Sequence, residues 1–268
     1  MAFSPIEQGI TNNCFKTLRL IATDMDGTLT QRGKFTASLL QAFEDLRAAD
    51  IPVLIVTGRS AGWVSGLVTY LPVVGAMCAN APRFANAENG GLFYPADSAK
   101  AVPLTPIPDL VAHRQQLEVA YQRLKSEFPH IQESTDNRFR LTDWTFDNRD
   151  LTLTQLERLD TLCSSMGWGF TYSSVQCHIK PASQDKARGL MQVLQDYFPQ
   201  YAPQQVVTVG DSPNDASLFN PQLFPLSVGV ANVLEYASEL IYQPAYVTTA
   251  VEGEGFCELA QYLIKLVT

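Results

Sequence analysis

The stretch LRLIATDMDGT at residues 18–28 decides the fold. The run from Arg19 to Thr23 predicts a short buried strand. Two carboxylates two positions apart, Asp24 and Asp26, follow where this strand ends, and Gly27 lets the backbone turn sharply after them. Ligands of open parallel sheets bind beyond the carboxyl ends of the strands. We therefore expect one carboxylate to act as a nucleophile or metal ligand and the other as a general acid and base.

Strands and helices alternate on both sides of this stretch, which predicts βαβ units and a parallel sheet covered by helices on both faces. The predicted strands lie at 52–57, 73–79, 205–209, 226–230 and 246–248. The predicted helices begin at a Thr36 cap, cover 61–71, run from a Ser183 cap to Tyr197, and cover 233–239 and 256–266. The fold class is therefore α/β.

The middle of the chain does not alternate in this way. Helices are predicted at 110–128 and 154–166, the second capped by Thr152 or Thr154, and strands at 139–146, 169–174 and 176–179. We expect residues 92–181 to form an inserted α+β cap domain, and residues 1–91 and 182–268 to form the core. Residues 1–17 are expected to be a partly ordered extension without the features of a signal peptide.

Charge, apolar run length and the spacing of cysteines and histidines argue against several classes of function. The 268 residues carry 27 acidic and 19 basic side chains, a net charge of -8, which argues against a general nucleic-acid binder. No apolar run is long enough to span a bilayer, so no membrane partner is expected. The five cysteines form no CxxC pair, and the spacing of the three histidines gives no zinc site. These features favour a cytoplasmic protein with reduced thiols, and they leave the oligomeric state open.

Three further polar signals accompany the paired aspartates. Thr57 and Gly58 follow the second strand, where a hydroxyl and free backbone N–H groups suit a phosphoryl oxygen. Lys186 lies on a predicted helix, and GDSPND at 210–215 offers oxygen ligands of the kind Mg²⁺ prefers. Each signal alone has a plain structural alternative: a turn, a solvated lysine, or a helix start with proline in its first turn. Their joint occurrence in this order favours the functional interpretation.

With these motifs in this order, the chain from Leu18 onward resembles the haloacid dehalogenase (HAD) superfamily. It is most similar to subfamily IIB, whose α+β (C2B-type) cap follows the third strand. That branch includes Cof-type, sucrose-phosphate and mannosyl-3-phosphoglycerate phosphatases. The resemblance implies a HAD-like Rossmannoid core. It also implies an Mg²⁺-dependent phosphomonoester hydrolase that acts through an aspartyl-phosphate on a small phosphorylated metabolite, which we expect to be a sugar phosphate.

The resemblance also implies residue roles. Asp24 would be the nucleophile, and Asp26 would protonate the leaving alcohol and then activate water. Thr57, Gly58 and Lys186 would bind the phosphoryl oxygens. Asp24, the Asp26 carbonyl and Asp211 would bind the metal ion. Asn214 and Asp215 would hold the metal ion, its water and Lys186 in position. An anionic nucleophile and an anionic phosphate repel each other, so a metal ion and a lysine must offset both charges. Lys180 is the alternative lysine, but Pro181 separates it from the helix.

The cap should select the substrate. Strand alternation would place Arg138, Arg140 and Thr142 on one face, where arginine suits a second anion or sugar hydroxyls, so Arg140→Ala should raise KM more than it lowers kcat. His178 and Lys180 share a face of the last cap strand. A solvated sheet face is the alternative for both groups.

The chain departs from its relatives at several positions. Gly27 stands where sucrose-phosphate phosphatases typically carry Asn, and Asn80-Ala81 stands where Cof-type members often have Asn-Gly. Asn89, in the turn ENGG at 88–91, is a candidate contact for the substrate phosphate or the cap hinge, and a purely structural turn is the alternative.

Other functions remain open at this point. A phosphomutase or phosphonate-cleaving relative would use the same aspartate. A dehalogenase has no use for Asp26. A signalling receiver would carry its phosphorylated aspartate on a middle strand and would lack the insert. A non-catalytic module that binds phosphorylated metabolites on the same scaffold is a further alternative, which turnover would exclude.

Overall fold

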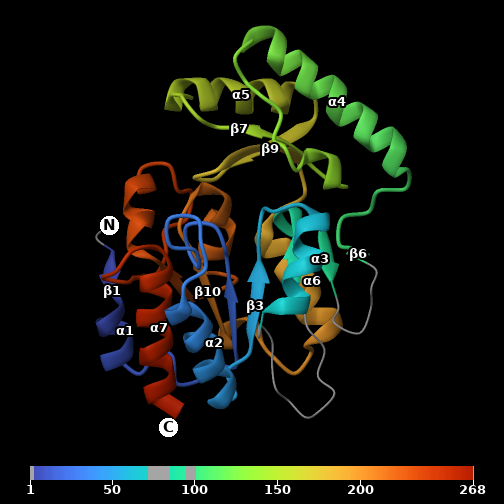
Figure 1. The fold of residues 1–268 in the computed structure, drawn as a ribbon. Coiled ribbons are helices and arrows are strands. Elements are labelled where there is room, and N and C mark those ends of the chain that lie inside the picture. The colour runs from blue at the N-terminus through green and yellow to red at the C-terminus, as the bar shows by residue number, and fades with distance from the viewer. Residues whose placement is uncertain (1–2, 72–84, 95–100, 268) are drawn as a thin grey trace.

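The computed structural model describes residues 3–71, 85–94 and 101–267, which form two sheets with helices packed on them (Figure 1). The larger sheet has the strand order β1-β12-β11-β10-β2-β3-β4-β5-β6. Its strands, in chain order, are β1 (Ser4–Pro5), β2 (Leu20–Thr23), β3 (Val53–Val56), β4 (Ala85–Ala87), β5 (Leu92–Tyr94), β6 (Val102–Pro103), β10 (Val206–Gly210), β11 (Leu226–Gly229) and β12 (Tyr246–Val247). All pairings from β1 to β4 in this order are parallel, and β5 and β6 add antiparallel pairings at the edge.

Both faces of the larger sheet are covered, as the alternation of elements predicts. The helices are α1 (Ile6–Thr11), α2 (Ala37–Ala48), α3 (Ala61–Tyr70), α6 (Lys186–Tyr197) and α7 (Glu252–Val267). Ile21 of β2 points into the cluster that α2 and α7 complete, where Phe43 and Phe256 meet edge to face. The neighbouring Leu20 points into the cluster that α6 completes. Successive residues of a strand face opposite sides, so a central strand must be apolar throughout.

The smaller sheet lies over the carboxyl ends of the parallel strands (Figure 1). It is antiparallel, with the order β7-β9-β8. Its strands are β7 (Trp144–Asp147), β8 (Trp168–Tyr172) and β9 (Gln176–Pro181), and its helices are α4 (Leu110–Glu127) and α5 (Leu153–Ser165). One apolar cluster joins these strands and helices. We call this unit the cap and the larger sheet with its helices the core.

Most predicted elements are confirmed within one to four residues at each end. Thr36 caps α2, because its side chain accepts a bond from the Leu39 N–H at 3.2 Å. Thr152 caps α5 through a reciprocal pair of bonds with Gln155. The prediction that Ser183 caps α6 is wrong: the cap is Asp185, whose carboxylate accepts from the Arg188 N–H at 2.8 Å.

Two other predictions are corrected. Residues 139–146 do not form one strand: a 3-10 turn, Asn137–Phe139, precedes an irregular segment, and β7 begins only at Trp144. Residues 1–17 were predicted to be a partly ordered extension, but from Phe3 onward they are ordered against the core, since β1 pairs with β12 and the side chains of Ile6 and Phe15 are buried. The strand predicted at 73–79 lies outside the described residues, and β4 is the described neighbour of β3.

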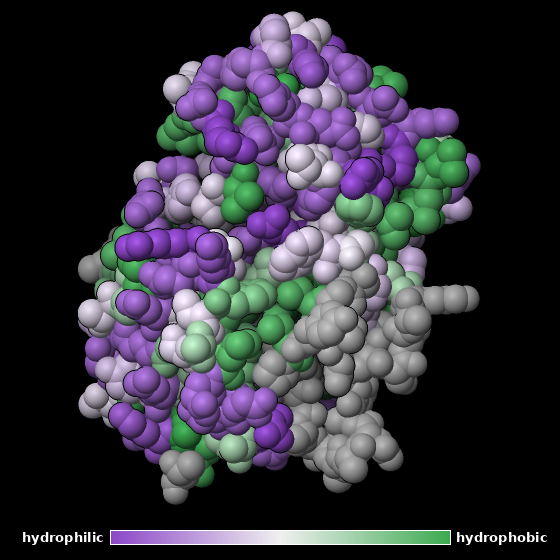
Figure 2. Space-filling view, in the orientation of Figure 1, coloured by the Kyte–Doolittle hydropathy of each residue, from purple (hydrophilic) through white to green (hydrophobic). Residues whose placement is uncertain are grey.

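The division of the chain into a core and an insert stays a prediction, with one adjustment. Strands β5 and β6 extend the larger sheet, so the topology favours an insert that begins after Pro103 instead of at residue 92. No helix in the described part of the chain is long and apolar enough to cross a membrane. Hydrophilic residues cover most of the face drawn in the space-filling view, and hydrophobic residues gather in small groups (Figure 2).

Candidate active site

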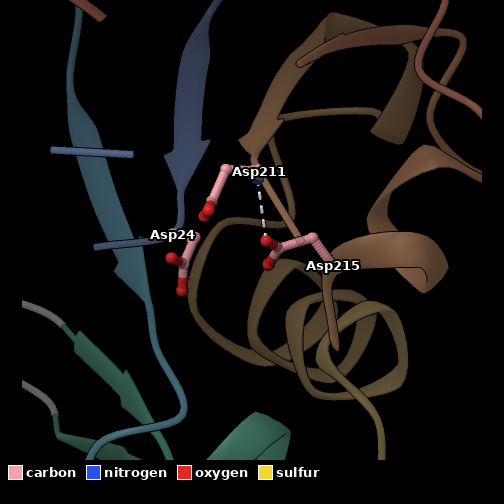
Figure 3. A group of neighbouring side chains, drawn as sticks. All are labelled: Asp24, Asp211 and Asp215. Carbon is pink, nitrogen blue, oxygen red and sulfur yellow. Dashed lines mark hydrogen bonds between the residues drawn. The ribbon is translucent and has the colours of Figure 1, made fainter. Parts of the chain in front are cut away.

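Three buried carboxylates meet at the carboxyl edge of the core sheet (Figure 3). Asp24 directly follows β2, and its N–H donates to the Val209 carbonyl of the adjacent strand β10. Asp211 directly follows β10, and Asp215 lies in the 3-10 turn Pro213–Phe219. One carboxylate oxygen from each of the three lies within 4.8 Å of the others. Because β2 and β10 are parallel neighbours, they bring residues 187 positions apart into one cluster.

Lys186, the first residue of α6, is the buried cation of this cluster. Its Nζ lies 2.5 Å from Asp24 Oδ1 and 2.6 Å from Asp215 Oδ1. Burial lowers the pKa of Lys186, but the charges of Asp215 and Asp24 outweigh burial and raise it, so the lysine is held as a cation. Lys180 instead donates to the Gln184 carbonyl, and burial lowers its pKa. Of the two candidate lysines, the structure therefore brings Lys186 to Asp24.

The cluster carries more negative than positive charge. Burial raises the pKa of Asp24 to about 7, and the charges of Asp215 and Asp26 add to this effect against that of Lys186. Burial, with the charges of Asp215 and Asp24, raises the pKa of Asp211 well above its ordinary value. A divalent cation with a preference for oxygen ligands would offset this excess.

Asp211 is held in place by groups on both sides. The Thr28 hydroxyl donates to its Oδ1 at 3.0 Å, and the Asn232 amide donates to its Oδ2 at 3.1 Å. The same amide donates to the Gly27 carbonyl at 3.0 Å, so it ties the DMDGT loop to Asp211. Gly27 has φ +79°, and a Cβ there would lie 2.4 Å from Asp211 Oδ2, which explains why glycine stands at this position. Asn232 was not predicted, because no motif surrounds it.

Both carboxylate oxygens of Asp215 accept hydrogen bonds from other residues of the protein. Its Oδ1 accepts from Lys186, and its Oδ2 accepts from the backbone N–H groups of Asp211 and Ser212 at 3.0 and 3.2 Å. These bonds fit the predicted supporting role better than direct metal binding, since each oxygen already has a donor.

The turn after β3 lies beside this cluster. Thr57 is buried, and its hydroxyl accepts from the Arg59 N–H at 3.2 Å while its carbonyl accepts from the Asn89 N–H at 3.1 Å. Asn214 donates to Asn89 Oδ1 at 3.2 Å. The buried Nδ2 of Asn89 has no hydrogen-bond partner among the described residues, which leaves it as a donor for a ligand. Asn80 and Ala81 lie outside the described residues.

Asp26 forms an ion pair that the sequence motifs did not indicate. Both of its carboxylate oxygens accept from the Arg59 guanidinium, from Nε at 2.7 Å and from Nη2 at 2.6 Å. Arg59 is the residue after Thr57 and Gly58 in VTGR, and its place at a strand end is the signal that could have identified it.

The cavity over Asp24 is closed by the hairpin of β8 and β9. Its walls combine core and cap residues: Asp24, Asp26, Gly58, Arg59 and Asn214 from the core, and Ser173, Val175, Gln176 and His178 from the cap. The cavity holds about 10 Å³, which is room for roughly one water molecule. Any substrate therefore requires the cap to move away from the core.

The structure does not place the predicted cap arginines on a common strand face. The Arg140 guanidinium is buried and already bonded to Asp143, Asp136, Gln176 and the Gly58 carbonyl, at 2.9–3.0 Å. Its Nη atoms link the cap to the Thr57–Gly58 turn, and Arg140 is not among the described residues that line the cavity. Arg138 is exposed, with its guanidinium 4.6 Å from the centre of the Phe139 ring.

His178 is the one predicted cap candidate in the cavity wall. Its Nδ1 lies 2.9 Å from Asp143 Oδ2, and its Cε1 lies close to Gly58, where a Cβ would come within 3.2 Å of that atom. Burial lowers the pKa of His178, although the charge of Asp143 opposes this effect. A neutral imidazole at this position can offer one hydrogen bond to a ligand without adding charge.

Glu88 joins the cap to the core and was read from the sequence only as part of a turn. Its carboxylate accepts from the core through the Ala61 N–H at 2.9 Å. It accepts from the cap through the Leu141 N–H at 3.0 Å, the Thr142 N–H at 2.6 Å and the Thr142 hydroxyl at 2.8 Å. These bonds explain why residues 141 and 142 do not continue a strand: their backbone N–H groups donate to a buried carboxylate instead of to a neighbouring strand.

We expect Glu88→Gln to lower the free energy of unfolding by about 1–3 kcal/mol. An amide nitrogen would face the Thr142 donors, which would lose an acceptor in a buried place. Urea unfolding measures the loss, with the exposed Glu118→Gln as control. Equal urea midpoints for the two variants would show that Glu88 does not hold the cap.

Known proteins resemble this chain in sequence. The sequence pattern of haloacid dehalogenase-like hydrolases matches residues 21–96. A phosphoglycolate phosphatase of Natronomonas pharaonis is 30% identical over 240 residues, which is 89% of this chain and 94% of that protein. A phosphoglycolate phosphatase of Thermoplasma acidophilum is 26% identical over 207 residues, 75% of this chain and 81% of that protein.

Solved structures resemble it in fold. Protein 0175 of Thermoplasma acidophilum matches with a TM-score of 0.69 and 21% identity, over 93% of this chain and 99% of that one. The sucrose-phosphatase of Synechocystis, solved with sucrose and phosphate, matches with a TM-score of 0.66 and 16% identity, over 92% of this chain and 98% of that one. The predicted fold class, a Rossmannoid parallel sheet with separate antiparallel cap elements, is confirmed.

Proposed function

This chain belongs to the haloacid dehalogenase-like hydrolase family and is a phosphatase, and from this premise we propose how its residues hydrolyse a phosphomonoester. The observation that carries the proposal is the contact of Lys186 with Asp24 and Asp215 beside Asp211. It supplies a carboxylate nucleophile, a fixed cation and a set of oxygen ligands at one place.

In the first step, an oxygen of Asp24 attacks phosphorus, and the bond from phosphorus to the ester oxygen breaks. The proton of the Asp26 carboxyl group passes to the leaving oxygen, so the product is a neutral alcohol. In the second step, the Asp26 carboxylate takes a proton from water, whose oxygen attacks phosphorus. The bond from phosphorus to Asp24 breaks, inorganic phosphate leaves, and both carboxyl groups return to their starting states.

The other residues would bind the phosphoryl group. Lys186, the Thr57 hydroxyl and the Gly58 backbone N–H would donate to its oxygens, and the unpaired Nδ2 of Asn89 is a further donor. The Asp24 carboxylate, the Asp26 carbonyl and Asp211 would hold Mg²⁺, and the excess of buried carboxylates over cations supports this fit. The metal ion, when bound, lowers the repulsion between the anionic nucleophile and the anionic phosphate.

The proposal extends to the substrate and the setting. The curated relatives act on phosphoglycolate by name, so we propose a small phosphorylated metabolite, either a short phosphorylated acid or the sugar phosphate expected from the sequence. Phosphate release from both classes and from nucleotides, with Mg²⁺ and with a chelator, is the direct test. If folded, metal-loaded protein released phosphate from none of these compounds, the proposal would be contradicted. A cytoplasmic setting without membrane or nucleic-acid partners is part of the proposal, and the net charge of -8 supports the absence of a nucleic-acid partner.

Metal binding should depend on pH in a defined direction. The pKa of Asp24 is raised to about 7 in the metal-free protein, so protons compete with Mg²⁺ below that pH. For the same reason, the metal-free protein should lose stability as the pH rises from about 4 to about 7, because the folded state holds a proton that the unfolded state has lost.

We therefore expect Mg²⁺ to raise Tm more at pH 8 than at pH 5.5. Thermal unfolding with and without the metal ion, at both pH values, measures the difference. An equal shift at the two values would argue against Asp24 as a ligand.

A further inference from the structure

The steps proposed above give no role to Arg59, a charged residue in the wall of the active-site cavity. Its guanidinium makes a two-pronged bond to Asp26, and its Cζ lies 5.5 Å from the centre of the Trp63 ring. The side chains of Arg59 and Asp26 are 25% and 17% exposed, so the pair is reachable from solvent, unlike the buried Lys186 cluster. Both groups lie in the wall of the cavity that also contains Asp24.

The ion pair between Arg59 and Asp26 conflicts with the role of general acid proposed for Asp26. A general acid must turn a protonated oxygen toward the leaving group, and in this arrangement both oxygens accept from Arg59. Asp26 can act only after the guanidinium has moved away or has found another anion. A charge-assisted, bidentate contact is a strong hydrogen bond, so a competing group must also be anionic to replace it.

Arg59 is also the arginine among the described residues that line this cavity. Arg140 does not line this cavity, and its two Nη atoms already donate to cap carboxylates, Gln176 and the Gly58 carbonyl. Lys186 is bound to Asp24 and Asp215, and Arg138 does not line the cavity. A substrate anion beyond the phosphoryl group would therefore meet Arg59.

We propose that Arg59 binds a carboxylate on the substrate, and that this carboxylate replaces Asp26 at the guanidinium and so frees Asp26 to act on the leaving oxygen. The inference rests on the proposed function and deepens it by naming the substrate class. The planar fork of arginine matches a carboxylate with two parallel bonds. Asp24 and Asp26 are two residues apart and share one narrow cavity, so the carboxylate must lie close to the phosphoryl group. The class is thus a phosphorylated hydroxy acid whose carboxylate lies close to the phosphoryl group.

Two substrates of similar size, one with a carboxylate and one without, test the proposal. Phosphoglycolate carries a carboxylate where 2-hydroxyethyl phosphate carries a neutral alcohol. The measured quantity is the ratio of their kcat/KM values. We expect the wild-type protein to prefer phosphoglycolate, and Arg59→Ala to lower this preference by about 10- to 100-fold, mainly through KM for phosphoglycolate. Arg59→Lys should retain part of the preference, because an ammonium keeps the charge but not the fork.

Arg149→Ala is the matched control, since Arg149 pairs with Asp147 at the surface and is 83% exposed. It should leave the preference unchanged. A wild-type ratio near one, or an unchanged ratio in Arg59→Ala, would overturn the proposal. Equal loss on both substrates in Arg59→Ala would show instead that Arg59 only shapes the site.

A binding measurement separates failure of this inference from failure of the proposed function. If the wild-type protein hydrolyses neither compound, the proposed function is wrong for this class, and titration with 3-phosphonopropionate and propylphosphonate still tests Arg59. Tighter binding of the carboxylate compound, lost in Arg59→Ala, would support the subsite without turnover. Equal binding of the two compounds to the wild-type protein would exclude it.

Discussion

Asp24→Asn is expected to lower phosphatase activity by about four orders of magnitude or more, because an amide cannot replace the attacking carboxylate. The fold should survive the change. Burial and neighbouring carboxylates raise the pKa of Asp24 to about 7, so its charge is unfavourable in the metal-free protein at pH 8. A neutral amide of the same shape removes that repulsion, and we expect the metal-free variant to be at least as stable as the wild type at this pH.

Initial rates of phosphate release and thermal unfolding of the metal-free proteins measure the two effects. Asp45→Asn is the matched control, because Asp45 lies exposed on α2 and bonds only with Gln41 among the described contacts of its side chain. It should change neither quantity. Activity within about tenfold of wild type in Asp24→Asn would exclude a nucleophilic role.

Lys186→Met is expected to damage both activity and stability. The change leaves Asp24 and Asp215 as buried carboxylates without their shared cation. Loss of one partner of a buried ion pair costs about 3–5 kcal/mol of stability, and loss of a donor to the phosphoryl group costs about 10²- to 10³-fold in kcat. The loss of stability should be smaller at pH 5 than at pH 8, because protonation of Asp24, whose pKa is already raised to about 7, removes part of the uncompensated charge.

Lys180→Met is the comparison that separates the two lysines. Lys180 is also buried, but its Nζ bonds to the Gln184 carbonyl and not to the carboxylate cluster. We expect its activity to stay within a few fold of wild type. If Lys180→Met lost activity as strongly as Lys186→Met, the geometric choice between them would be wrong.

The sequence predicted best those site residues that directly follow a buried strand of the parallel sheet. β2 and β10 are buried on both faces and are directly followed by Asp24 and Asp211, so a parallel sheet brings these two residues together whatever lies between them. The same logic predicted the position of Thr57, whereas a role for Lys186 in the site was implied by the resemblance to the HAD superfamily. The assignment of roles to these residues stays a prediction that the variants above test.

The cap was harder to predict, because its polar residues bond across the chain. Arg140 and Thr142 fit a strand by alternation, but Glu88, more than fifty residues earlier, accepts the backbone donors of this segment. Asp26 and Arg59 are likewise 33 positions apart. Pairing between distant charged side chains leaves no periodic signal in a sequence, so these contacts required the structure.

The central claim is that phosphate passes through Asp24. Asp26→Asn removes both the acid of the first step and the base of the second, so the substrate for this test is a nitrophenyl phosphate, whose leaving group needs no proton. The intermediate should then still form, and its hydrolysis should be slow because no base activates the water. We would mix this variant with ³²P-labelled substrate and Mg²⁺, quench in acid, and map the bound label by peptide mass spectrometry. The account predicts a label on Asp24 that is absent from Asp24→Asn. Turnover of the substrate without any protein-bound label, or a label on another residue, would contradict it.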